Sequence, residues 1–234
     1  MNDHEPTTER SGVDLYSAFV AAYEAHGRGG TRPGRRVTDA GHWWRRICRI
    51  DGSPLMMSGD LHPDDRRARR QLAEWEVAGV THILDVRAEC HDRRRVAEWA
   101  PRIEYLWLGV DDHGGRQDPA WFDAGVDRAL EACADPAARL MVHCHMGMNR
   151  GPSMAYAILL ASGWDPVEAL EAVTLARPIA AVIYALDALD WWHARAGVPA
   201  ATAQREHAQV AEWLARNRVD TAWVMSRIRR DEVA

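Results

Sequence analysis

Apolar residues in this chain gather in short continuous runs that are separated by longer periodic segments. Three continuous runs rich in β-branched residues, at 81–86, 103–110 and 139–144, predict strands buried in a parallel sheet. Two alternating stretches, at 46–50 and 55–57, predict further short strands. These five segments are the expected strands of the fold.

Segments with an apolar residue every three or four positions lie between these runs and predict helices. A first helix is expected at 11–26 with Ser11 as its cap, followed by a Gly- and Arg-rich connector at 27–41. Val77 is expected on the inward face of the next helix. The later helices are expected at 64–78, 93–99, 119–134, 151–162, 166–176, 179–195 and 204–233, the last as one helix or a pair. Strands alternating with helices predict an α/β fold, with a mostly parallel central sheet flanked by helices and extra helices at both ends.

Composition narrows the class of protein. The 234 residues carry a net charge of −5, which argues against nucleic acid and anionic membrane surfaces as partners. No apolar run approaches the roughly 20 residues of a membrane span, and residues 1–10 lack a signal-peptide core. The four cysteines fit neither a zinc framework nor a disulfide scaffold, so a cytoplasmic location is expected. All 29 basic residues are Arg, which excludes a lysine Schiff base and a Walker lysine.

The stretch MVHCHMGMNRGPS at 141–153 carries the candidate chemistry. A buried strand ends just before Cys144, and a proline in the first turn begins an apolar helix. The 144–150 loop is therefore expected at the carboxyl end of a strand and the amino end of a helix. Ligands bind at this place in open α/β sheets.

The residue types in this loop suit a tetrahedral anion. Backbone N–H groups can form a concave nest, and the helix dipole adds partial positive charge. Gly147 allows the bend, and Arg150 offers a planar fork for two oxygens. Because the same field favours a thiolate, the pKa of Cys144 is expected to fall from ~8.5 to between about 3.5 and 7.5. The loop is predicted to place a nucleophilic thiolate in a phosphate cradle.

The run from His143 to Arg150 matches the His-Cys-x-x-Gly-x-x-Arg pattern of cysteine-dependent protein phosphatases, and the chain resembles the dual-specificity phosphatase family over roughly residues 42–195. The resemblance implies a protein-tyrosine-phosphatase-like fold. Its supporting pieces are SGDLHP (58–63), THILDVRAE (81–89), LGVDDHGG (108–115) and ARPIAAV (176–182).

The resemblance also implies a role for each matching residue. Cys144 would attack phosphorus to form a phosphocysteine, and Asp112, 32 residues earlier, would protonate the leaving oxygen, with Asp111 as a competing candidate. No metal or cofactor is expected, because the cradle supplies the positive charge. Phosphate binding is assigned to His145, Met146, Gly147, Met148, Asn149 and Arg150.

Three neighbouring positions carry further expectations. The family usually has Ser or Thr directly after the arginine, where the hydroxyl helps the sulfur to leave; here Gly151 stands there, and Ser153 follows two residues later. This departure bears on the rate of the second step. His143 is expected to point inward and bond backbone, and His145 to lie on the substrate side.

Several functions remain open at the level of sequence. The expected substrate is a phosphorylated protein or small phosphoester, because the loop residues 145–149 carry no fixed positive charge of the kind that relatives acting on polyphosphorylated lipids place there. The alternatives are a phosphate-binding module with little turnover and a nucleotide or RNA 5′-phosphatase. A rhodanese-like sulfur transferase fits the spacing to Arg150 less well.

The expected domain organisation has three parts. Residues 1–41 form an N-terminal helix and linker, 42–200 the catalytic domain, and 201–234 a helical extension. The sequence leaves the oligomeric state and the role of the two terminal parts open.

Overall fold

A computed structural model describes residue 35 and residues 43–233 of the chain. The helix expected at 11–26 and nearly all of the 27–41 connector lie outside the described residues. Five strands form one sheet in the order β1-β2-β5-β3-β4, in which β1 is antiparallel and the others are parallel. The strands are β1 (Cys48–Arg49), β2 (Leu55–Ser58), β3 (His82–Arg87), β4 (Glu104–Val110) and β5 (Leu140–His143). The predicted α/β fold with a mostly parallel sheet is confirmed.

Helices cover both faces of this sheet because successive residues of each buried strand point to opposite sides. Met56, Ile83 and Met141 pack on one face beneath α2 and α3, whereas Leu84 and Val142 pack on the other beneath α4–α7. The described helices are a 3₁₀ turn η1 (Trp43–Arg45), α2 (Asp65–Val77), α3 (Arg93–Trp99), α4 (Pro119–Ala132), α5 (Arg150–Ala161), α6 (Pro166–Ala176), α7 (Ala185–Ala196), α8 (Ala200–Arg216) and α9 (Thr221–Val233).

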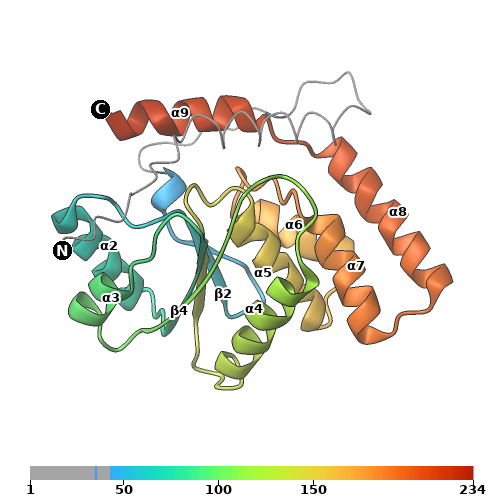
Figure 1. The fold of residues 1–234 in the computed structure, drawn as a ribbon, viewed down its shortest axis with the longest axis horizontal. Helices are drawn as coiled ribbons and strands as arrows, with labels where there is room; N and C mark the ends of the chain where they lie inside the picture. Colours follow the sequence, from blue (N-terminus) through green and yellow to red (C-terminus); the bar gives the residue numbers. More distant parts are fainter. Residues whose placement is uncertain (1–34, 36–42, 234) are drawn as a thin grey trace, which may run out of the picture.

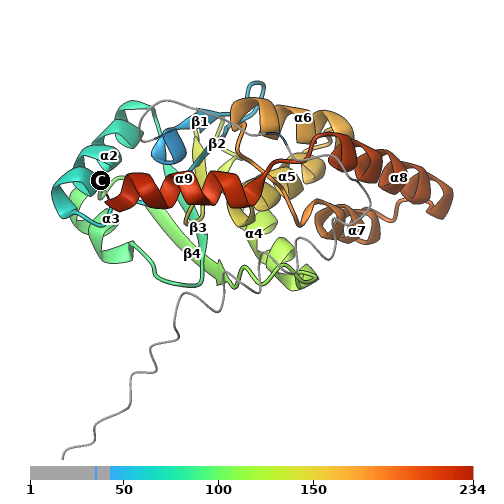
Figure 2. The ribbon, with the colours of Figure 1, turned by 90° about the horizontal axis from the view of Figure 1, so that it is seen from above.

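The C-terminal part of the chain forms two separate helices. Helix α8 packs against α6 and α7, and α9 then crosses the molecule above the sheet (Figures 1 and 2). A pair of helices was one of the two alternatives for 204–233, and the break between them falls at 217–220.

Two local expectations are wrong. Val77 is 90% exposed, because α2 buries the face that carries Ala68, Leu72 and Trp75, and Val77 falls outside that face. The helix expected at 179–195 begins only at Ala185. Val182 adopts φ 45°, a left-handed conformation that a helix cannot accommodate.

Candidate functional site

The 144–150 loop lies in the middle of the sheet's carboxyl edge. Its strand, β5, is flanked by β2 and β3, and α5 begins at Arg150 directly after the loop. Neighbouring strands therefore deliver the segments after Ser58 and Arg87 to the same place. This is the position expected for a ligand site in an open α/β sheet.

A buried arginine holds the outer side of this loop. Arg177 is 1% exposed, and its Nε donates to the Gly147 carbonyl at 2.5 Å. Its Nη2 donates to the carbonyls of Met146 (3.1 Å) and Trp44 (2.5 Å). The carbonyls of Met146 and Gly147 thus point outward to Arg177, and the loop can direct its N–H groups to the inner side.

Gly147 is required at the bend of the loop for two reasons. Its φ is +65°, and a Cβ there would lie 2.6 Å from Arg177 Cζ. Ala would therefore meet both an unfavourable backbone conformation and the guanidinium that holds the loop.

We expect Gly147→Ala to lower the melting temperature by about 5–10 °C, the combined cost of strain and displacement. Gly163→Ala is the matched control, because Gly163 has φ +86° but nothing lies within 4 Å of its Cβ position. Differential scanning calorimetry measures both. An equal fall in melting temperature in the two variants would contradict the role given to Arg177.

The nucleophile candidate is enclosed. Cys144 is 2% exposed, and burial raises the pKa of its thiol. The Arg150 charge and backbone N–H groups of Gly151 and Gly147 lower the pKa, while Asp112 raises it. The predicted net fall in pKa is therefore not found, because desolvation outweighs the favourable field in this closed arrangement.

Arg150 is held by an acidic partner that the sequence reasoning missed. Its Nη1 and Nη2 donate to the two carboxylate oxygens of Glu89 at 2.8 and 2.7 Å. Nη1 also donates to the Val110 carbonyl at 2.9 Å. The predicted anion fork is present, but Glu89 occupies it, so an incoming anion competes with a carboxylate.

Asp112, rather than Asp111, is brought to the loop. Asp112 Oδ2 lies 3.4 Å from Arg150 Nε, and its Oδ1 accepts from Asn149 Nδ2 and the Tyr184 hydroxyl, both at 2.7 Å. The side chain of Asp111 is exposed, and its carbonyl accepts a bond from Gln117 Nε2 at 3.5 Å. Tyr184 thus joins the site from the turn that replaces the start of the expected helix.

Asn149 fixes the end of the loop. Its Oδ1 accepts from the Ser153 hydroxyl at 3.2 Å and from Ile183 N–H at 2.8 Å, while its Nδ2 binds Asp112. The Ser153 hydroxyl also accepts from Tyr184 N–H at 3.3 Å. Ser153 is thus engaged by Asn149 and Tyr184, and residue 151 is a glycine without a hydroxyl.

The two histidines beside Cys144 differ in setting. His143 is buried as expected, and its Nε2 lies 3.7 Å from Asp85 Oδ2. Within the described part of the chain its Nδ1 has no hydrogen-bond partner, so the expected bond to backbone is not seen there, and burial lowers its pKa. His145 is the more accessible of the two, with 41% of its side chain exposed, and its Nδ1 lies 2.7 Å from Asp60 Oδ2.

Three of the residues missed from the sequence lie in segments that already carried the family resemblance, whereas Tyr184 lies just beyond ARPIAAV. Asp60 belongs to SGDLHP, Glu89 ends THILDVRAE, and Arg177 lies in ARPIAAV. The segments that contain these three residues match the family, but the residues that they contact lie elsewhere in the chain. Those contacts cannot be known before the fold is known.

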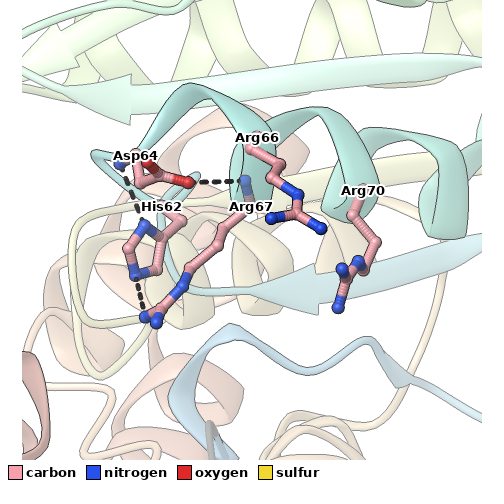
Figure 3. A pocket seen from close by; sticks show the side chains of 5 residues that line it. All are labelled: His62, Asp64, Arg66, Arg67 and Arg70. Atoms are coloured by element: carbon pink, nitrogen blue, oxygen red, sulfur yellow. Dashed lines mark hydrogen bonds between the residues drawn. The ribbon is translucent and has the colours of Figure 1, made fainter.

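A separate hollow of about 640 Å³ opens at the start of α2 (Figure 3). It contains none of the predicted site residues. Its lining is His62, Asp64, Arg66, Arg67 and Arg70. Within residues 35 and 43–233, no group of three His, Cys, Asp or Glu side chains is placed to hold a metal ion. No helix in that same part is long and apolar enough to cross a bilayer.

Comparisons with known proteins bear on the family and the fold. No protein-family model matches the chain. Dual specificity protein phosphatase 26 of Bos taurus is 28% identical over 106 residues, or 43% of this chain and 47% of that protein. Dual specificity protein phosphatase 1 of Mus musculus is 24% identical over 36% of this chain and 22% of that protein. The chain thus spans about half and about a fifth of the length of these relatives.

Solved structures show the same fold. A mouse putative dual specificity phosphatase with zinc tungstate matches at TM-score 0.53 and 20% identity, covering 70% of this chain and 98% of that one. The structure of PTPMT1 matches at TM-score 0.51 and 26% identity, covering 66% of this chain and all of that one. The active form of Tk-PTP matches at TM-score 0.52 and 20% identity, covering 65% and 99%.

Proposed function

Because the chain has the fold of the dual-specificity phosphatases and is a relative of that family, we propose that it is a cysteine-dependent phosphatase. It hydrolyses phosphate monoesters through a phosphocysteine intermediate. The observation that carries the proposal is the meeting of Cys144, Arg150 and Asp112 around one loop, with 3.4 Å between Arg150 Nε and Asp112 Oδ2. We assign the catalytic unit to residues 42–200.

The proposed first step transfers the phosphoryl group to sulfur. The Cys144 thiolate attacks phosphorus while the bond to the leaving oxygen breaks, and Asp112 gives that oxygen a proton. Arg150 exchanges Glu89 for two phosphoryl oxygens and stabilises their charge together with the loop amides. In the second step water attacks the phosphocysteine, Asp112 takes its proton, and inorganic phosphate and the thiolate are released.

Asp112→Asn is expected to lower kcat for phosphopeptide hydrolysis by about 10²-fold, since it removes the proton donor. The loss is expected to be smaller for p-nitrophenyl phosphate, whose leaving group needs less protonation. Asp111→Asn is the matched control and is expected to stay within about twofold, because Asp111 points to solvent. Steady-state kinetics at several pH values decide between the two, and the opposite ranking would make Asp111 the acid.

The substrate proposed is a phosphotyrosine, phosphoserine or phosphothreonine residue. Support comes from the loop itself, in which Arg150 is the one residue with a fixed positive charge. The test is release of phosphate from phosphopeptides, p-nitrophenyl phosphate, a 5′-phosphorylated RNA and a phosphatidylinositol phosphate, with vanadate as inhibitor. The lipid is included because a solved structure of PTPMT1 contains PI(5)P. If none of these substrates gave vanadate-sensitive release of phosphate, the proposal would be wrong.

A module with little turnover is the second candidate, and two observations favour it. Glu89 already fills the Arg150 fork, and burial raises the pKa of the Cys144 thiol. Stoichiometric phosphocysteine formation without continued release of phosphate would support this candidate over the enzyme.

A further inference from the structure

Helix α9 shares an apolar cluster with the 144–150 loop. Its buried side chains Val224, Met225 and Ile228 form one apolar cluster with the loop residues Met146 and Met148. In both views the helix crosses above the carboxyl edge of the sheet, where the loop lies (Figures 1 and 2). One side of the loop is therefore covered by a helix from outside the region of family resemblance.

A line of charged side chains continues this contact to the residue next to the nucleophile. Glu232 Oε1, near the end of α9, lies 3.2 Å from Arg45 Nη2. Arg45 also binds Asp60 Oδ1 through Nη2 (2.9 Å) and Nε (3.1 Å). Asp60 Oδ2 lies 2.7 Å from His145 Nδ1, and Asp60 N–H donates to the His145 carbonyl at 2.8 Å. We call these four residues the α9 relay.

We propose that His145 is a substrate-binding cation of the 144–150 loop, and that α9 positions it through Glu232, Arg45 and Asp60. The ligand group is an oxyanion of the substrate, either the reacting phosphoryl group or an acidic group beside it. This inference rests on the proposed phosphatase function and extends its site to the C-terminal helix.

The geometry leaves one nitrogen of His145 for a ligand. Nδ1 is engaged by Asp60, so Nε2 carries the remaining N–H of the imidazolium. Among residues 35 and 43–233, the hydrogen bond of this ring is the one from Nδ1 to Asp60, and 41% of the side chain is exposed. An N–H donor fixed at its other end and open at this one is suited to an anionic oxygen.

The surrounding charges favour the cationic form of this imidazole. Asp60 raises the pKa of His145, with smaller contributions from Glu232 of α9 and from Glu89, while burial lowers it. Arg45 faces Asp60 from η1, and Arg87 Nη1 of β3 lies 4.0 Å from Asp60 Oδ2. Three acidic groups from three parts of the chain thus act on one histidine.

The placement of Glu232 is not explained by α9 itself. A carboxylate in the last turn of a helix faces the negative end of the helix dipole, which is unfavourable. Its contact with Arg45, whose side chain is only 7% exposed, offsets this cost. Glu232 therefore stabilises the contact between α9 and Arg45 and does not stabilise the helix itself.

The test replaces the member of the relay that belongs to α9. In Glu232→Gln, NMR titration should give a lower His145 pKa than in the wild type. KM for a phosphotyrosine peptide should rise about twofold to fivefold near neutral pH, with kcat within about twofold. Because deprotonation of His145 removes the cation, KM rises with pH in both proteins, and this rise should begin at lower pH in the variant.

Glu212→Gln is the control, because it removes the same charge from a surface helix: Glu212 pairs with Arg216 (2.9 Å) on α8, away from the relay. It should match the wild type in titration and kinetics. An unchanged His145 pKa in Glu232→Gln, or a pKa shift without any change in KM, would overturn the inference. If the wild type hydrolyses no phosphoester, the proposed function fails, and the shift of the His145 signal on adding inorganic phosphate decides the inference alone.

Discussion

Cys144→Ser is expected to reduce turnover of every phosphoester substrate by at least ~10⁴-fold. The hydroxyl of serine is far less acidic than a thiol, so no nucleophile forms at this position near neutral pH. The fold should persist, because Ser is nearly the same size and the buried surroundings of residue 144 include backbone N–H donors from Gly147 and Gly151. Single-turnover phosphate release and mass spectrometry of the trapped protein measure the effect.

Binding should survive this substitution. Arg150 and the loop amides remain, so the dissociation constant of inorganic phosphate for Cys144→Ser should stay within about threefold of that for the wild type. Cys133→Ser is the control, since Cys133 is a free, half-buried thiol at the end of α4. Residual turnover above one hundredth of wild type would mean that another group carries the chemistry.

The pH dependence of the wild type follows from the same thiol. Burial raises the pKa of Cys144, so the thiolate becomes the main form only at higher pH. The attack step therefore accelerates as pH rises through that pKa, which places the acidic limb of kcat/KM higher than for an exposed thiol in a positive field.

Local patterns were sufficient to predict most elements of the fold. The bounds of α3 and α6 agree with the expected helices, because an apolar stripe and a Pro or polar cap mark their ends. The predicted start of the 179–195 helix was wrong, because two N–H groups in its first turns bond the loop. Ala181 N–H donates to the Met148 carbonyl, and Ile183 N–H donates to Asn149 Oδ1. Tertiary bonds to the loop, which no local pattern reveals, replace the first turns.

Some residues of the candidate site could likewise be predicted from the local sequence, and others could not. Cys144 and Arg150 follow from a contiguous motif, and the preference for Asp112 over Asp111 agrees with where their side chains lie. Glu89 and Asp60 were not predicted, because each meets its partner only when β2, β3 and β5 bring their carboxyl ends together. The predicted fall in the pKa of Cys144 was wrong for a related reason. The sequence shows which charges lie near a group but not how deeply the group is buried.

Arg150→Lys is expected to lower kcat/KM by about 10³-fold, although the positive charge is kept. The guanidinium contacts Glu89 with two nitrogens and the Val110 carbonyl with one of them, a planar arrangement that also fits two oxygens of a phosphoryl group. An ammonium presents one point of charge and cannot bridge two oxygens in this way. The loss should fall mainly on kcat, because the fork stabilises charge that develops in the transition state.

Arg128→Lys is the matched control, because Arg128 pairs with Glu131 at 2.8 Å on the exposed face of α4 and lies outside the site. It should leave kcat/KM within about twofold. Thermal unfolding of both variants separates catalysis from folding, since a shorter side chain at residue 150 also leaves Glu89 less well paired. If Arg150→Lys retained wild-type kcat with an intact fold, the planar fork would have no part in the reaction, and charge alone at this position would be sufficient.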